Sequence, residues 1–158
     1  MIIDQRISID APLDRVWDFM LDVPAVSACV PGVESVTARR DGTYSGVLKV
    51  KVGPISARLE GSLTLADADR EARRARIDIE AADKRLGGTV RAKMTMRLEP
   101  LADGGTELHL STDAAILGKL GQFGQAVIKR QADNIVAEFA RNVSRTLAGL
   151  MPAREGLS

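Results

Sequence analysis

The feature that most constrains the fold is a long run of alternating apolar and polar residues between Val33 and Ile116. Apolar residues spaced two apart are typical of strands with one buried and one solvated face. Turn sequences of a few residues, such as Gly53-Pro54 and Asp103-Gly104-Gly105, interrupt the run. Because short connectors join antiparallel neighbours, we expect six consecutive strands in a meander that curls.

The flanking segments complete the predicted fold. Residues 2–10 also alternate and predict a seventh strand, after which Asp10 is expected to cap a short helix with Pro12 in its first turn. A second short helix fits before Pro31-Gly32. Apolar residues then recur at i, i+3, i+4 and i+7 over roughly residues 120–150, which predicts a long helix. We expect an α+β fold, with this helix lying across a curved seven-stranded antiparallel sheet.

Size and composition are those of one globular domain. The chain has 158 residues, of which 45% are hydrophobic and 27% charged. We expect a single domain over residues 1–150 and a short flexible tail over 151–158. A net charge of +1 favours no nucleic-acid partner. The N-terminus carries early charges, and no apolar run is long enough to cross a membrane, so we expect a cytoplasmic protein.

The inward positions of the predicted sheet are unusually small. They include six glycines and alanines: Gly46, Ala57, Gly61, Ala75, Ala81 and Ala92. Small residues indicate either close packing against a helix or space left for another molecule. Close packing is the more common outcome in protein interiors, and both interpretations remain open at this point.

No catalytic residues or metal ligands can be assembled from the sequence. His109 is the only histidine and alternates outward, and Cys29 is the only cysteine and is expected to be a small buried residue. One histidine and one cysteine do not make a typical structural zinc site, and a general base needs a cleft and a positioned partner. We therefore predict no catalytic residues, no metal site and no cofactor.

Two segments of the C-terminal region are candidates for ligand control. Gly118, Gly121 and Gly124 recur every three residues, which predicts either a flexible start to the long helix or a hinged gate. Gln131 lies near the apolar stripe of that helix, where its amide would contact a ligand, bond across to the sheet or lie at an edge in water.

Several segments of the chain resemble one known family. The order of elements resembles the helix-grip fold of the START/Bet v 1-like (SRPBCC) superfamily. More narrowly, residues 11–17 (APLDRVW), 29–34 (CVPGVE) and 44–54 (YSGVLKVKVGP) and the later Gly61 resemble the G-subunit family of carbon monoxide dehydrogenase. The similarity covers about residues 1–148. The first of these segments is common across the superfamily, whereas CVPGVE and KVKVGP are more specific.

The resemblance implies a hollow between the sheet and the long helix that takes a lipophilic small molecule, such as a quinone. It also implies a non-catalytic accessory role for a molybdenum hydroxylase such as carbon monoxide dehydrogenase. Some relatives carry a long C-terminal extension that reaches the membrane. This chain stops at Ser158, so we expect no such anchor and leave peripheral membrane contact and oligomeric state open.

The residues expected to line the hollow are inward or helix-stripe positions. They are Trp17, Leu48, Val50, Leu59, Leu63, Ile79, Met94, Met96, Leu110, Leu120, Phe123, Val127 and Gln131. Trp17 has a core role as its alternative. Two other functions remain: a maturation, assembly or membrane-recruitment factor that acts through its surface with a packed core, and a cyclase- or hydrolase-like enzyme. The enzyme ranks last because the inward positions are almost wholly apolar.

Overall fold

A computed structural model of the chain describes residues 1–149. The elements follow in the order β1 (Ile2–Ile9), α1 (Leu13–Met20), α2 (Val23–Ser27), β2 (Val33–Ala38), β3 (Tyr44–Val52), β4 (Ile55–Asp69), β5 (Arg74–Asp83), β6 (Gly88–Pro100), β7 (Thr106–Gly118), the 3-10 turn η1 (Lys119–Phe123) and α3 (Gln125–Leu147). The order of elements is the predicted one, with η1 as an addition.

All seven strands form one antiparallel sheet in the order β1-β7-β6-β5-β4-β3-β2. Neighbours along the chain are therefore neighbours in the sheet from β2 to β7, as the meander predicts. The first strand, β1, pairs with the outer side of β7. Inward residues lie in register, so that Leu63 of β4 is opposite both Tyr44 of β3 and Ile79 of β5. The predicted α+β helix-grip fold is confirmed.

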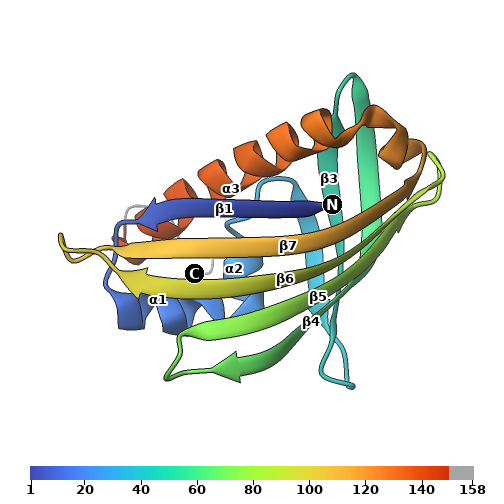
Figure 1. Ribbon diagram of the computed structural model, residues 1–158. Coiled ribbons are helices and arrows are strands. Elements are labelled where there is room, and N and C mark those ends of the chain that lie inside the picture. The colour runs from blue at the N-terminus through green and yellow to red at the C-terminus, as the bar shows by residue number, and fades with distance from the viewer. Residues whose placement is uncertain (150–158) are drawn as a thin grey trace.

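Small residues face one another across β3, β4 and β5. Gly61 is opposite Gly46 on one side and Ala81 on the other. A Cβ placed on Gly61 would lie 1.9 Å from the carbonyl oxygen of Glu80, and one placed on Gly46 would lie 2.9 Å from that of Ser35. Both glycines are therefore required by close approach of backbone. The curl turns β3 upright beside the flatter strands β5 to β7 (Figure 1).

Two short helices cover one end of the sheet (Figure 1). The prediction that Asp10 caps α1 is wrong: the N-cap is Pro12, and no side chain caps the helix. The backbone N–H of Asp10 instead donates to Oγ of Ser144 in α3, 2.9 Å away. The second helix does have an acidic cap, because the Asp22 side chain accepts from the N–H of Ala25.

The long helix is shorter than predicted. The pattern indicated one helix from about residue 120, but a 3-10 turn ends at Phe123, and the α-helix begins only after Gly124, whose φ is 87°. An α-helical residue needs a negative φ, so Gly124 separates the two elements. The α-helix ends at Leu147, with Gly149 at φ 74° just beyond it, as expected. Leu150 and the predicted tail 151–158 lie outside the described residues.

The packed core occupies the end of the sheet that α1, α2 and the C-terminal half of α3 cover. Trp17 and Cys29 are 1% and 2% exposed, which confirms that each is buried there. The buried cluster comprises Ile9, Ala11, Val16, Trp17, Met20, Cys29, Ala75, Met96, Leu98, Leu108, Leu110, Phe139, Ala140 and Val143.

Candidate functional site

The concave face of the sheet divides into a packed half and an incompletely packed half. Of the thirteen predicted lining residues, four are buried: Trp17, Met96, Leu110 and Leu120. The first three belong to the packed core, and Leu120 lies in η1. The other nine are half-buried: Leu48, Val50, Leu59, Leu63, Ile79, Met94, Phe123, Val127 and Gln131.

The half-burial of these inward side chains is informative because three of them lie in the middle of the sheet. Leu59, Leu63 and Ile79 come from β4 and β5, the middle of the sheet, and point to the same face as the fully buried Ala75. Close packing would remove such large apolar groups from water. We give the name hollow to the region bordered by the half-buried inward residues of β3 to β6, under the N-terminal half of α3.

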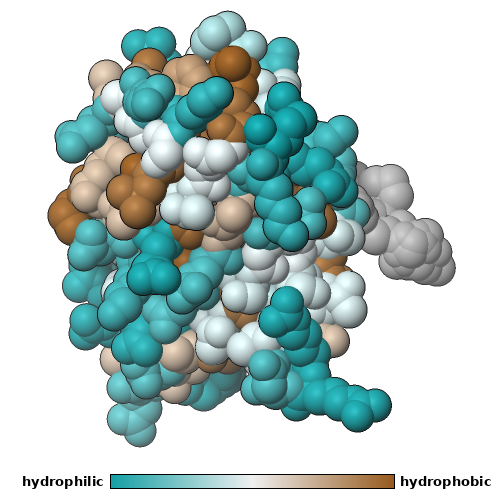
Figure 2. Space-filling view, turned by 90° about the vertical axis from the view of Figure 1, so that its right-hand side faces the viewer, coloured by the Kyte–Doolittle hydropathy of each residue, from teal (hydrophilic) through white to brown (hydrophobic). Residues whose placement is uncertain are grey.

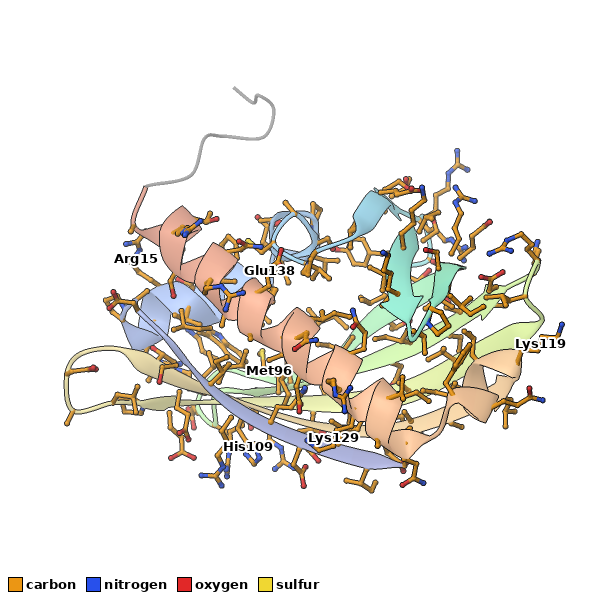
Figure 3. The ribbon with its side chains drawn as sticks, turned by 90° about the horizontal axis from the view of Figure 1, so that it is seen from above. Arg15, Met96, His109, Lys119, Lys129 and Glu138 are labelled. Atoms are coloured by element: carbon orange, nitrogen blue, oxygen red, sulfur yellow. The ribbon has the colours of Figure 1, made fainter. Side chains whose placement is uncertain are left out.

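An opening lies between β3 and α3, and Val50 and Gln131 of the predicted lining belong to it. It is a pocket of about 300 Å³ lined by Pro31, Gly32, Lys49, Val50, Lys51, Gln131, Asn134, Ile135 and Glu138. We call this opening the mouth. Val50 and Ile135 supply its apolar surface, and Gln131 and Asn134 supply amides. Seen from above, Met96 lies beneath α3, and Glu138 lies on the side of the helix that faces α2 and β3 (Figure 3).

Sequence reasoning placed Gln131 at the site and missed its polar neighbours. Asn134 and Glu138 are three and seven positions further along α3, so they share its side of the helix. The same helical spacing that defines the apolar stripe could have identified them. Lys51 could not be found in this way, because it lies on a different element and alternates outward from the hollow.

The η1 end of the hollow is closed by side chains of the predicted gate segment. A Cβ placed on Gly88 would lie 2.6 Å from Cγ of Leu120, and one placed on Gly53 would lie 3.7 Å from the Phe123 ring. Leu120 therefore packs on β6, and Phe123 packs on the turn between β3 and β4. Figure 2 faces this end, where apolar side chains lie among hydrophilic ones.

The three glycines of the predicted gate differ in their surroundings. A Cβ on Gly118 would lie 2.2 Å from the carbonyl oxygen of Gly87, and one on Gly121 would lie 2.4 Å from that of Ile116. Nothing lies within 4 Å of a Cβ on Gly124. Gly118 and Gly121 thus fit close-packed positions, whereas Gly124 is the open point between η1 and α3.

A buried carboxylate holds the turn between β5 and β6. Asp83 is 2% exposed, and its oxygens accept from the backbone N–H groups of Leu86, Arg58 and Arg85 at 2.8–2.9 Å. These hydrogen bonds, with Leu86 the largest contributor, hold the pKa of Asp83 below its usual value. With three bonds to backbone, this carboxylate is occupied structurally and is a poor candidate for a catalytic base.

A polar contact joins α3 to the edge of the sheet. Nε2 of Gln5 donates to Oδ1 of Asp133 at 2.9 Å, and Nζ of Lys129 donates to Oδ2 at 3.0 Å. Hydrogen bonds from Gln5 and then Lys129 lower the pKa of Asp133. This contact fixes the N-terminal half of α3 against β1, on the side of the helix opposite the mouth.

His109 lies on the outer face of the sheet, as predicted, and is directed away from the hollow (Figure 3). Its Nδ1 lies 3.0 Å from Nη2 of Arg97, which can only donate, so Nδ1 is the acceptor in this contact. Within residues 1–149, no group of three or more His, Cys, Asp or Glu side chains is placed to hold a metal ion.

The comparison that decides the family is a match over residues 6–148 to the family model of the carbon monoxide dehydrogenase G subunit (CoxG). This match spans nearly the whole chain. The chain belongs to the CoxG family. No curated protein sequence matches this CoxG-family chain.

Solved structures share the fold of this CoxG-family protein at low sequence identity. A conserved protein from Geobacillus kaustophilus has a TM-score of 0.84 at 18% identity, with 94% of this chain and 96% of that chain covered. A START superfamily protein from Mycobacterium smegmatis has a TM-score of 0.64 at 10% identity, with 95% and 99% covered. The Zhui aromatase/cyclase from Streptomyces sp. R1128 has a TM-score of 0.62 at 18% identity, with 94% and 97% covered.

These structural similarities establish the START-like fold and no more, because fold and activity vary independently at such identities. Membership of the CoxG family together with this fold indicates a ligand-binding accessory protein. In the part of the chain that the structure describes, no helix is long and apolar enough to span a membrane.

Proposed function

We propose that this CoxG-family protein binds a lipophilic small molecule, such as a quinone, in the hollow, without catalysing its conversion. In this role it is an accessory to a molybdenum hydroxylase such as carbon monoxide dehydrogenase. The observation that carries the proposal is the half-burial of large apolar side chains at the centre of the concave face.

The lining that we propose contains fewer residues than the sequence alone indicated. Trp17, Met96 and Leu110 belong to the packed core and so support the hollow from its far end. The lining we propose consists of eight half-buried apolar residues and one amide, with Leu120 as an end wall: Leu48, Val50, Leu59, Leu63, Ile79, Met94, Phe123, Val127 and Gln131.

The mouth favours a ligand with an apolar body and a polar head. Small-molecule sites are usually apolar pockets with a few placed polar groups. Here Val50 and Ile135 lead inward, and Gln131 and Asn134 offer amide donors and acceptors at the rim. Burial of about 200 Å² of apolar ligand surface would contribute roughly 5 kcal/mol before the cost of association.

The two rival functions have less support. A surface-acting factor with a packed core would not leave Leu59, Leu63 and Ile79 half-exposed. An enzyme of the cyclase or hydrolase type needs polar groups free to act on the substrate. Among residues 1–149, the one buried carboxylate on an inward position is that of Asp83, and both of its oxygens accept hydrogen bonds from backbone N–H groups.

The proposal is tested by purification without detergent, solvent extraction and mass spectrometry, followed by calorimetric titration with a short-chain quinone. We expect a co-purifying lipophilic molecule, or saturable one-to-one binding with a negative heat-capacity change. Absence of both would contradict the proposal. Co-purification of a molybdenum hydroxylase without ligand binding would instead support the surface-acting factor.

A further inference from the structure

A second concave feature lies on the other side of α3 from the mouth. It is a groove of about 700 Å³ between the free edge of β1 and the C-terminal half of α3. Its rim includes Arg6 and Ser8 of β1, Glu107 of β7 and Arg141, Ser144 and Arg145 of α3. We call it the β1–α3 groove. No part of the proposed ligand site contributes to it.

The groove concentrates positive charge in a chain whose net charge is only +1. Three arginines and one carboxylate line it. Oε1 of Glu107 lies 3.7 Å from Nη1 of Arg6, a loose pair in which Arg6 is exposed and Glu107 is half-buried. Arg141 and Arg145 form no ion pair within residues 1–149 and are exposed. Two guanidinium groups are therefore available to carboxylates from outside the chain.

The same groove exposes unpaired backbone. β1 is an edge strand that pairs with β7 alone. Met1 and Ala114 exchange both of their backbone hydrogen bonds, so residues 3, 5, 7 and 9 bond to β7, and residues 4, 6 and 8 face the free edge. Asp10 also directs its N–H to the free edge, where it donates to Oγ of Ser144.

The free edge of β1 and the cationic side chains of α3 together indicate which kind of molecule fits the groove. An extended peptide can add to an edge strand by backbone hydrogen bonding, while its side chains confer specificity. The Gln5–Asp133 and Asp10–Ser144 contacts bound the groove at its two ends. About three residues of extended chain, roughly 10 Å, fit between them. We propose that the β1–α3 groove binds a short extended acidic segment of a partner protein.

In this arrangement, the partner backbone pairs with the N–H and C=O groups of Arg6 and Ser8. Its carboxylates bond to Arg141 and Arg145, and its small apolar residues lie on Ile7 and Ala137. The lipophilic ligand and the acidic segment would occupy opposite sides of α3. The two proposals therefore succeed or fail separately.

The test uses the whole protein, labelled with ¹⁵N, and an acetylated Asp-Val-Asp amide peptide as the probe, which matches the three residues that fit in the groove. We expect saturable shifts of the backbone amides of Arg6, Ser8 and Ser144 on titration. The pair Arg141→Glu and Arg145→Glu should weaken binding at least tenfold. Arg130→Glu is the matched control: it reverses an exposed charge on the same helix outside the groove and should have little effect.

Two further probes separate the parts of the proposal. A backbone N-methylated form of the peptide and the acetylated Asn-Val-Asn amide peptide should each bind at least tenfold more weakly. Equal binding of all three peptides, or loss of binding by Arg130→Glu alone, would overturn the proposal. So would Arg141- and Arg145-dependent binding of phosphatidylglycerol vesicles without any peptide binding, because it would assign the groove to a lipid surface.

Discussion

At the scale of single residues, Asp83 shows how one side chain sets a turn that borders the hollow. It is an inward position of β5 that accepts three backbone hydrogen bonds, from β4 and from the turn to β6. The strands on which Leu59 and Ile79 lie are therefore tied together at this point. Its lowered pKa means that the charged form is favoured in the folded state.

We expect Asp83→Asn to lower the melting temperature at pH 7 and to flatten its dependence on pH. With a folded pKa below the unfolded value of about 3.9, the carboxylate stabilises fully above that value. The contribution is lost as the pH falls through the folded pKa. Thermal unfolding from pH 7 to pH 3 measures this. Glu80→Gln, an exposed change on the same strand, is the control, and equal curves for wild type and Asp83→Asn would contradict the role.

Gly88 and Leu120 form a second residue-scale contact, which closes the end of the hollow. An alanine at position 88 would collide with Leu120, so Gly88→Ala should destabilise the protein by about 1–3 kcal/mol. In a Leu120→Ala background, the same change should cost less than about 1 kcal/mol. Urea unfolding of the four proteins gives the coupling energy, and strict additivity would show that Leu120 does not pack on β6.

At the scale of elements, the strands were predictable and the helix boundaries were not. Alternation is a local signal, so it located β3 to β7 directly. The capping role of Asp10 failed because Pro12, two residues further on, is the N-cap, and no side chain caps the helix. The helix start failed because apolar spacing continues through Leu120 and Phe123, whereas the break depends on the backbone angle of Gly124.

The structure also narrows where a gate could move. Gly118 and Gly121 fill tight positions, and the N–H of Lys119 donates to the carbonyl of Gly87, so η1 is anchored to the turn between β5 and β6. By contrast, nothing lies within 4 Å of a Cβ placed on Gly124. The carbonyl of Gly124 accepts from the N–H of Ile128, within the first turn of α3. We infer that any hinge lies at residues 124–127.

Hydrogen exchange tests this hinge at the scale of α3. The amides of residues 125–127 belong to the first turn, which has no side-chain cap, and should exchange at least tenfold faster than that of Ile135. Val143, buried in the packed core, should exchange most slowly. Uniform protection from residue 124 to Ile135 would show that the segment does not open.

At the scale of the whole molecule, the proposed function depends on an uneven division of the concave face into packed and half-buried parts. The sequence predicted which residues face inward, because alternation determines that. It did not separate Trp17, Met96 and Leu110 from the half-buried positions, because that depends on where α1, α2 and the end of α3 pack. Only the assembled fold distinguishes the packed core from the half-buried positions. It also brings Lys51 of β3 and Gln131 of α3 to the same mouth.

The central claim is tested most directly by filling the hollow. Ile79→Trp places a large ring beside Leu63, whereas Glu80→Trp places the same ring on the outer face of the same strand. Calorimetric titration of both variants with a short-chain quinone is the measurement. We predict at least tenfold weaker binding for Ile79→Trp and wild-type binding for Glu80→Trp, with both variants folded by circular dichroism. Equal binding by the two variants would contradict a ligand site in the hollow.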